Sequence, residues 1–569
     1  MEPKATRIRW GVVGVTTISA FLLYLDRYCV SFAGSAIQQE LNVSPAGMGL
    51  FVSAFFWSYA LFQVPAGWIG QRFGIRTALT AYILLWSLFT GLLGFVSSVT
   101  TIIIFRLLCG LAQAGAFPCA GRAVRDWLPM SQRGTGSACV TFGGRVGGAV
   151  TPLLTGSLML FFAVLRSGPE FQSHEILSPA SAAQAIIAPH ANEAADWYRK
   201  LRTDAAPDSD ASRLARTLVD TDREKLAAFL NDPATLPPFL VGIPWEELPP
   251  DLYRRLQSWD SQSPDHQREA ARRFWESALP KQVKKLEARG WRPVVILFGG
   301  MGVFVALAFW WLFRDDPSQH PWCNAEEVEL IHRDWPKLPA GTVISTPKFP
   351  WRFLLTNPSL WGNSVMQFMT NVGWLFLGTT LPRYLDEVHH VPVLQRSVLA
   401  SVPLFAGWFG ILLGGPWTDR WTAWKGRKWG RRGPIACSRL LAVGGYLLVL
   451  AVMWGAFGSR ESLTAIWIAV AGLSLVAVAT DLGVPATWAF AQDVGGKHTS
   501  AVLGWANMWG NIGAAVFSLF SEMILGKTPG LMHWTWLCSA CAAAFAISAV
   551  CACLMDASRP VADDSGHSL

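Results

Sequence analysis

The chain has 569 residues, of which 51% are hydrophobic and 15% are charged, with 29 Trp and 33 Phe. Soluble domains carry about 25% charged residues, so this composition excludes an ordinary soluble protein and indicates a polytopic membrane protein. The net charge of +8 does not indicate nucleic-acid binding. Residues 167–290 hold 16 of the 47 basic and 19 of the 39 acidic residues, so the basic excess lies in short loops elsewhere.

The first apolar segment, residues 10–33, contains Asp26 and Arg27 side by side. A bilayer span needs about 20 residues, and a charge at its centre costs roughly 2.5–3.5 kcal/mol. Such a charge usually faces other helices or a pathway for a polar solute. On a helix, Tyr24, Arg27 and Tyr28 share one face, which we expect to line a solute site. The alternative is that both charges lie at the outer end of the span and reach the interface.

Eleven further apolar segments follow, and the twelve fall into two groups of six. The predicted spans are residues 10–33, 49–70, 77–97, 99–121, 135–164, 293–313, 357–382, 394–417, 434–457, 462–486, 499–525 and 531–555. The predicted fold is therefore an all-α membrane protein with twelve transmembrane helices in two six-helix halves. A long insertion separates helices 5 and 6.

The predicted domain order follows from these spans. It is an N-terminal half with helices 1–5 (1–166), a helical insertion (167–290), helix 6 (291–313), a cytoplasmic linker (314–356), a C-terminal half with helices 7–12 (357–556) and a cytoplasmic tail (557–569). In the linker, Asn324 precedes Glu326 and Glu327, which predicts a capped helix start.

Basic residues gather in the loops on one side of the predicted spans, as is typical of cytoplasmic loops. They are Lys4, Arg7, Arg9, Arg72, Arg76, Arg122, Arg125, Arg133, Arg420, Lys425, Arg427, Lys428, Arg431 and Arg432. We therefore expect a multi-pass protein of the cytoplasmic (inner or plasma) membrane with both termini in the cytoplasm. The insertion then lies on the extracytoplasmic side.

The second helix of each half ends in a similar turn, GWIGQR in the first half and GPWTDR in the second. The residues that we assign to this repeated loop motif are Gly67, Arg72, Gly415, Asp419 and Arg420. Two parallel six-helix halves are one of the standard transporter constructions, with the solute site near the midplane between them.

The two turns resemble the loop motif of the major facilitator superfamily, which usually has Asp where this chain has Gln71. Further stretches resemble its anion:cation symporter branch, which includes bacterial hexuronate, galactonate and glucarate transporters and animal sialin-like and vesicular glutamate carriers. These stretches are YLDR (24–27), FRLLCGLAQAGAFP (105–118), RAVRDWLP (122–129), RDDP (314–317), Trp488-Ala489 and the region of Asn507 to Asn511. The resemblance covers nearly all of the chain except 167–290.

The resemblance implies a substrate site built from both halves. Arg27 matches an arginine that binds the substrate carboxylate, and Tyr24 and Tyr59 match polar aromatic residues near it. Trp488 and Asn507 match positions that contact the solute from the C-terminal half. From the residues alone, Tyr59, Trp488 and Asn507 could equally be packing or interhelical contacts.

Two residues depart from the family pattern. Gln113 stands where the family usually has a glutamate that carries the proton, and Arg145 stands where sugar-acid transporters tend to have an uncharged polar residue. These departures leave proton coupling and the choice of anion open. Arg145 either faces the solute pathway or pairs with a buried acid. With Arg27 it would form a strongly anion-attracting site, since the guanidinium fork suits carboxylates.

Three other intramembrane charges are candidate coupling or gating residues. Arg106 shares a helix face with Gln113, and we expect it to position the helix, with Asp26 as its candidate partner. Asp481 is a further acid that could couple transport to an ion or pair with a cation.

We interpret the chain as a secondary active transporter for a small organic anion, a sugar acid such as a hexuronate, aldonate or aldarate, working by alternating access. One alternative is an exchanger or facilitator for phosphate, a phosphorylated solute or a dicarboxylate. Another is a transporter-like membrane sensor with 167–290 as a ligand or partner module. No P-loop, nucleophile–base set or metal-ligand spacing is present, so we expect no enzyme activity, cofactor or metal. The expected partners are the anion, the bilayer and either a co-transported proton or sodium ion or none, and we expect a monomer.

Overall fold

The protein is described here from a computed structural model. It describes residues 5–41, 43, 45–167, 170–187, 195, 198–199, 210–218, 222–240, 253, 256–279, 282–283, 290–333, 351–389, 391, 393–460, 462–526 and 530–558. These residues form helices and one isolated antiparallel bridge between Ile176 and Val283, in keeping with the predicted all-α class.

The N-terminal half consists of seven helices before the insertion and one after it. They are α1 (Ile8–Phe32), α2 (Gly34–Leu41), α3 (Pro45–Phe73), α4 (Ile75–Leu92), α5 (Val99–Ala114), α6 (Ala116–Trp127), α7 (Arg133–Ser167) and α15 (Trp291–Leu312). Within this half, α1 packs on α7 and α15, α3 on α5, and α4 on α15.

The C-terminal half repeats this plan. Its helices are α18 (Pro358–Leu375), α19 (Leu381–Glu387), α20 (Val393–Met453), α21 (Leu463–Leu482), α22 (Val484–Gly495), α23 (Thr499–Leu525) and α24 (Leu531–Leu554). A short π-helical segment, Phe376–Thr380, joins α18 to α19. The long α20 is two helices joined at Gly426, whose φ of 73° interrupts the helical path.

Nine helical stretches among the described residues are long and apolar enough to cross a membrane, which makes this a multi-pass membrane architecture. One of them, Val398–Met453, contains the joint at Gly426. The predicted number of twelve crossings and the predicted domain boundaries stay predictions.

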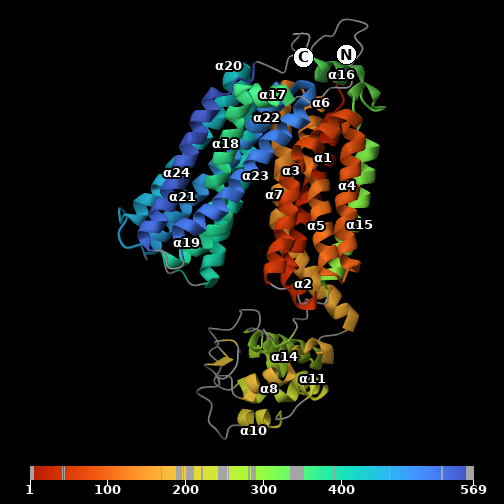
Figure 1. Ribbon diagram of the computed structural model, residues 1–569, viewed down its shortest axis with the longest axis vertical. Coiled ribbons are helices and arrows are strands. Elements are labelled where there is room, and N and C mark those ends of the chain that lie inside the picture. The colour runs from red at the N-terminus through yellow and green to blue at the C-terminus, as the bar shows by residue number, and fades with distance from the viewer. Residues whose placement is uncertain are drawn as a thin grey trace.

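The two halves stand side by side as separate bundles (Figure 1). Both chain ends and α16 (Ala325–His332) lie on one face of the bundle, which we call the terminal face. The elements between α7 and α15 lie beyond the opposite face.

Elements between α7 and α15 have a buried core of their own. They include α8 (Pro179–Ile187), α10 (Asp210–Arg216), α11 (Arg223–Asn231), α12 (Pro237–Leu240) and α14 (Pro264–Ala278). Phe274 and Trp275 lie at the centre of this core. Arg272 is buried beside it and binds Glu175 at 3.0 Å and Glu276 at 2.7 Å, so its charge is compensated inside the unit.

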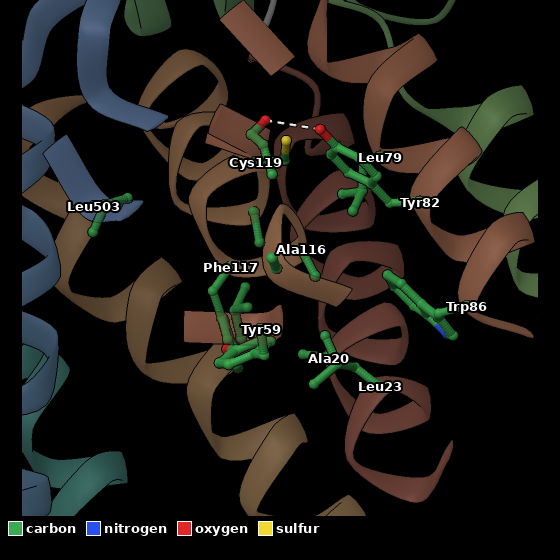
Figure 2. Close-up of a cluster of buried hydrophobic side chains, with 14 of the residues drawn as sticks. Ala20, Leu23, Tyr59, Leu79, Tyr82, Trp86, Ala116, Phe117, Cys119 and Leu503 are labelled. Atoms are coloured by element: carbon green, nitrogen blue, oxygen red, sulfur yellow. Dashed lines mark hydrogen bonds between the residues drawn. The ribbon is translucent and has the colours of Figure 1, made fainter. Parts of the chain in front are cut away.

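Each half contains a pair of consecutive helices that a single glycine separates. Gly115 separates α5 from α6, and Gly483 separates α21 from α22. A Cβ atom at Gly115 would lie 2.1 Å from the ring of Tyr82, whose hydroxyl donates to the carbonyl of Ala66 at 2.8 Å (Figure 2, dashed line). A Cβ atom at Gly483 would lie 2.3 Å from Oγ of Ser438. Glycine is therefore needed at both breaks because neighbouring helices approach the backbone closely.

Three helix N-termini on the terminal face receive carboxylates from distant segments. Glu327 accepts from the backbone N–H groups of α1 at Ile8 and Arg9, both at 3.1 Å. Asp315 accepts from the first N–H of α4 at 2.6 Å, and Asp419 accepts from two N–H groups of α7, both at 2.9 Å. These N–H groups have no partner within their helices and lie at the positive end of the helix dipole, so a carboxylate stabilises them.

Hydrogen bonds and ion pairs at the terminal face join the two halves. Asp419 belongs to α20 but caps α7 of the other half. Asp493 of α22 binds Arg133 of α7 at 2.8 Å and Arg431 of its own half at 2.8 Å. Gln492 donates to the carbonyl of Gly121 at 3.0 Å. Toward the opposite face, the ribbons of the two halves diverge (Figure 1).

Glu327 supports a stability prediction. Its side chain is 0% exposed, and the side chain of Asn324 caps its backbone N–H at 3.0 Å, as the sequence predicts for this helix start. Burial alone would raise the pKa of Glu327, but hydrogen bonds from Thr6, Arg9 and Ile8 outweigh it and hold the pKa below its usual value. A lowered folded-state pKa means that the ionised group adds stability above its unfolded pKa and loses it as pH falls through the folded pKa.

We therefore expect Glu327→Gln to lower the free energy of unfolding at pH 7 by about 1.5–3 kcal/mol, the scale of hydrogen bonds to a charged group. The matched control is Glu329→Gln, which changes an exposed acid of the same helix and should be neutral. Thermal unfolding of the purified protein at pH 7 and at lower pH measures both. Equal melting temperatures for the two variants at pH 7 would contradict this role.

Candidate functional site

Arg27 is a buried cation held by aromatic rings. It is 7% exposed, and its guanidinium carbon lies 4.3 Å from the ring centre of Tyr59, 5.1 Å from Tyr24 and 5.2 Å from Phe55. Its Nε donates to Oε1 of Gln113 at 3.1 Å. Nη2 has no hydrogen-bond partner among the described residues. An unpaired buried charge is costly, so this guanidinium is a candidate anion-binding group.

Asp26 turns away from Arg27, as their positions on the helix require. It is 1% exposed and accepts from the Ser87 hydroxyl at 3.3 Å. The alternative that Asp26 and Arg27 lie at an outer helix end is wrong, because both are buried inside the bundle.

The expected pairing of Arg106 with Asp26 is also wrong. The guanidinium of Arg106 lies over the rings of Phe51 at 5.4 Å and Phe55 at 4.7 Å. No ion pair joins it to Asp26 in the part of the chain that the structure describes. Arg106 and Arg27 therefore share the ring of Phe55, and cation–π contacts rather than a carboxylate hold both groups.

Arg145 reaches from the N-terminal half to the C-terminal half. Its Nη2 donates to Oδ1 of Asp481 at 2.7 Å, and its guanidinium carbon lies 4.6 Å from the ring centre of Trp374. The glycines around it allow close contact with α1, since a Cβ at Gly147 would lie 2.4 Å from the carbonyl of Phe21. Of the two sequence-based alternatives for Arg145, the structure shows the pairing with a buried acid. Its side chain nevertheless keeps 28% of its surface exposed.

A chain of aromatic rings connects the two halves near Arg27. The ring of Tyr24 lies 6.0 Å from Phe117, which follows the break in the α5–α6 helix, and Phe117 lies 5.3 Å from Trp488 of α22. Figure 2 shows Phe117 beside this break and Leu503 of α23 approaching α6 from the other half. Trp488 therefore lies where the halves meet.

Tyr59 contacts one of the two arginines, whereas Asn507 has no hydrogen bond to either of them among the described residues. Tyr59 covers the guanidinium of Arg27 directly. Asn507 is half-buried on α23, and its backbone carbonyl accepts from the Asn511 side chain at 2.8 Å. No hydrogen bond joins Asn507 to either arginine among the described residues, so its contact with a solute stays a prediction.

The repeated loop motif lies where the halves meet on the terminal face. Gly67 lets α3 approach the backbone of α23, because a Cβ there would lie 2.4 Å from the carbonyl of Ser500. Gly415 lies similarly close to Gly134, with a Cβ-to-carbonyl distance of 3.0 Å. Asp419 caps α7, as described above, whereas Gln71 contacts Nδ1 of His498 at 3.3 Å. Of the two motif arginines, Arg72 lies over the ring of Trp68 on its own helix, and Arg420 is exposed.

Four residues near the site or between the halves escape the sequence reasoning. Phe117 lies in the stretch 105–118 that carries the family resemblance, but the resemblance assigned it no role, and Trp374 is one aromatic residue among many. Arg439 and Asp493 are buried charges. Arg439 lies inside the predicted span 434–457, which is the signal that could have found it, whereas Asp493 lies between two predicted spans and carries no such signal. Arg439 donates to the carbonyl of Thr480 at 3.0 Å, next to the helix break at Gly483.

The arrangement suits an anion rather than a metal ion. Arg27 of α1 lies 5.1 Å from the ring centre of Tyr24, and a Cβ at Gly144, the residue before Arg145 on α7, would lie 2.8 Å from the same ring, so the two arginines come from helices that meet at Tyr24. Arginine forks bind carboxylates and related oxyanions in two-point geometry. Among the described residues, no group of three His, Cys, Asp or Glu side chains could hold a metal ion.

Comparison with known proteins places the chain among transporters. It is 24% identical over 544 residues to the probable galactarate/D-glucarate transporter of Escherichia coli K12, covering 92% of this chain and 89% of the relative. It is 23% identical to the probable sulfoacetate transporter of Cupriavidus necator, covering 91% and 87%. A probable galactarate/D-glucarate transporter of Bacillus subtilis is 40% identical, but over 141 residues only, 24% of this chain and 31% of the relative. These names support the expected anion:cation branch.

Solved structures show the same fold. The transporter FucP in its outward conformation superimposes with a TM-score of 0.55 at 12% identity, covering 96% of this chain and 99% of FucP. The human organic anion transporter MFSD10 superimposes with a TM-score of 0.53 at 13% identity, covering 95% and 100%. The family model of the Major Facilitator Superfamily matches residues 16–166 and 286–518. Since this match spans both halves and leaves out most of the segment between α7 and α15, the chain belongs to the major facilitator superfamily.

Proposed function

We propose that the protein is a secondary active transporter that carries a sugar acid across the cytoplasmic membrane by alternating access. The observation that carries this proposal is Arg27, a buried guanidinium with a free Nη2 inside an aromatic cage. A carboxylate bound there would pair the charge and satisfy the free donor. The relatives named as galactarate, glucarate and galactonate transporters support a sugar acid.

Arg145 favours a substrate with two anionic groups. Galactarate, glucarate and sulfoacetate, three of the substrates named for the relatives, each carry two such groups, whereas galactonate carries one. This chain provides one arginine on α1 and a second on α7, two helices that meet at Tyr24. An aldarate is therefore the sugar acid that the charges suit best, and a simpler dicarboxylate is the runner-up.

The distribution of basic loops supports a cytoplasmic position for the terminal face. In that orientation the segment between α7 and α15 is extracytoplasmic. The contacts of Asp419, Asp493 and Gln492 then close the cytoplasmic side, and the conformation described here is outward-facing.

The separate core between α7 and α15 favours a second candidate, a transporter-like sensor that uses this unit as a ligand or partner module. Counterflow in proteoliposomes distinguishes the two functions, because a sensor binds its ligand without exchanging it. Exchange of labelled glucarate against unlabelled glucarate supports the transporter.

Topology is tested by cysteine labelling. Ala234 is exposed between α11 and α12, and Ala423 is exposed on the terminal face. We expect Ala234→Cys to react with an impermeant thiol reagent in cells with an intact cytoplasmic membrane, after outer-membrane permeabilisation where the host has one. Ala423→Cys should react only after lysis, and the unmodified protein gives the background of its ten native cysteines. The reverse pattern would overturn the orientation.

The anion site is tested by Arg27→Gln and Arg27→Lys. Removing the guanidinium should weaken glucarate binding by on the order of 100-fold, the upper range for a hydrogen bond to a charged group. The lysine variant keeps the charge but not the fork, so its loss should be intermediate. Isothermal titration calorimetry of purified protein measures both, with Arg420→Gln, a change at an exposed position of α20, as control. Wild-type affinity in Arg27→Gln would show that this arginine only supports the fold.

Coupling is tested through Gln113. An amide does not titrate, and Arg27 stays charged, so we expect weak proton coupling in the native protein. The variant Gln113→Glu places a titratable group at hydrogen-bond distance from Arg27. Uptake into proteoliposomes with an imposed pH gradient should then depend on the gradient in this variant and little in the native protein. Strong gradient-driven accumulation by the native protein that Asp26→Asn abolishes would contradict this prediction and assign coupling to Asp26.

A further inference from the structure

The broken helices of the two halves place different groups at equivalent positions. Gln113 lies two residues before the break glycine Gly115, and Asp481 lies two residues before the break glycine Gly483. Each accepts a hydrogen bond from an arginine. Gln113 accepts from Arg27 of its own half at 3.1 Å, whereas Asp481 accepts from Arg145 of the other half at 2.7 Å. The C-terminal half therefore has a carboxylate where the N-terminal half has an amide.

Asp481 lies between two cations. Its side chain is 5% exposed, and Gly407 leaves room for it, because a Cβ there would lie 2.6 Å from Oδ2. Arg439 interacts with it electrostatically from the same half while donating to the carbonyl of Thr480. Arg145 contacts it from the other half and keeps 28% of its side chain exposed. A solute can therefore reach Arg145 more easily than it can reach Asp481.

We propose that Asp481 is an internal counter-anion for Arg145, which holds this guanidinium in the empty protein and releases it to the second anionic group of the substrate. This inference rests on the proposed function, since it requires an anion in the site. The released carboxylate keeps its electrostatic interaction with Arg439, which donates to the neighbouring carbonyl of Thr480. One ion pair between the halves is thereby exchanged for a bridge through the substrate.

The exchange matters for the return of the empty carrier. Without substrate, a closed site would bury the charges of Arg27 and Arg145 together, which is costly unless each is compensated. Asp481 compensates one of them. It therefore allows the empty protein to change sides, which net transport requires and which strict exchange does not.

The test compares binding of glucarate, with two carboxylates, and gluconate, with one. In Asp481→Asn the ratio of glucarate to gluconate affinity should rise about tenfold, the scale of one charge-assisted hydrogen bond. In Arg145→Gln the ratio should fall by a similar factor. The double variant Arg145→Gln/Asp481→Asn keeps the wild-type net charge, and we expect it to show the low ratio of Arg145→Gln. A wild-type ratio in the double variant would mean that net charge, not Arg145, sets the preference, and would overturn the proposal.

Asp493→Asn is the matched control. It also removes an ion pair between the halves from the same C-terminal half, but its partner Arg133 lies at the terminal face. It should leave the glucarate-to-gluconate ratio unchanged. A raised ratio in Asp493→Asn would show that loosening the halves is enough to alter the preference, which contradicts a specific role for Asp481.

A transport measurement adds a readout that a purely structural role would not move. In proteoliposomes, Asp481→Asn should lose net glucarate uptake into empty vesicles while keeping exchange in glucarate-loaded vesicles. Equal losses of net uptake and exchange would overturn the proposal. If the wild-type protein binds glucarate and gluconate but neither single variant changes the ratio, only the counter-anion fails. If no variant and no wild-type protein binds either acid, the proposed function itself fails.

Discussion

A guanidinium cannot lose its proton inside a membrane protein, so every buried arginine must find a partner or face a polar solute. This constraint organises the centre of the bundle. Aromatic rings cover Arg27 and Arg106, and Asp481 pairs with Arg145. Arg439 uses the carbonyl next to a helix break. Arg27, Arg106 and Arg439 each keep a guanidinium nitrogen without a hydrogen-bond partner among the described residues. Of these, Arg27 contacts Tyr24, which begins the row of aromatic rings to the other half, and for that reason the substrate proposal begins there.

At the terminal face, the stabilising groups are carboxylates that accept hydrogen bonds from helix N-termini. Glu327, Asp315 and Asp419 each come from a segment far along the chain, so each cap joins two pieces of the fold. Asp419 differs from the other two because its helix belongs to the opposite half. A cap within one half stabilises that half in every conformation, whereas a cap between halves must be broken when the halves separate on this face. Asp419 and Gln71, which stand at matching positions of the two motif copies, therefore both contact the opposite half, Asp419 at α7 and Gln71 at His498.

Much of this could be predicted from the sequence. Apolar segments and the repeated turn indicated the two-bundle fold, and Asn324 with its following acids predicted the start of α16. The helical face of Tyr24 and Arg27 was also predicted, because residues three apart on a helix are neighbours. Pairings between distant segments could not be predicted this way. Nothing local distinguishes Asp481 from Asp26 as a partner for an arginine. The predicted pairing of Arg106 with Asp26 is wrong because the guanidinium of Arg106 lies over the rings of Phe51 and Phe55 instead, and the sequence does not indicate which side chains of neighbouring helices meet.

The asymmetry between Gln113 and Asp481 connects the fold to the transport cycle. Two halves built on one plan would place matching groups at their helix breaks, and a matching acid near Arg27 would neutralise the binding arginine of the empty site. An amide stands there instead, so Arg27 has no carboxylate partner at this position, as the proposed substrate site requires, whereas Arg145 is paired with Asp481. That pair spans the interface between the halves, so any anion that draws Arg145 away from Asp481 changes what holds the halves together. In the proposed transport cycle, one ion pair therefore links substrate binding to the relative motion of the halves, because the same guanidinium cannot hold both partners with its full set of donors.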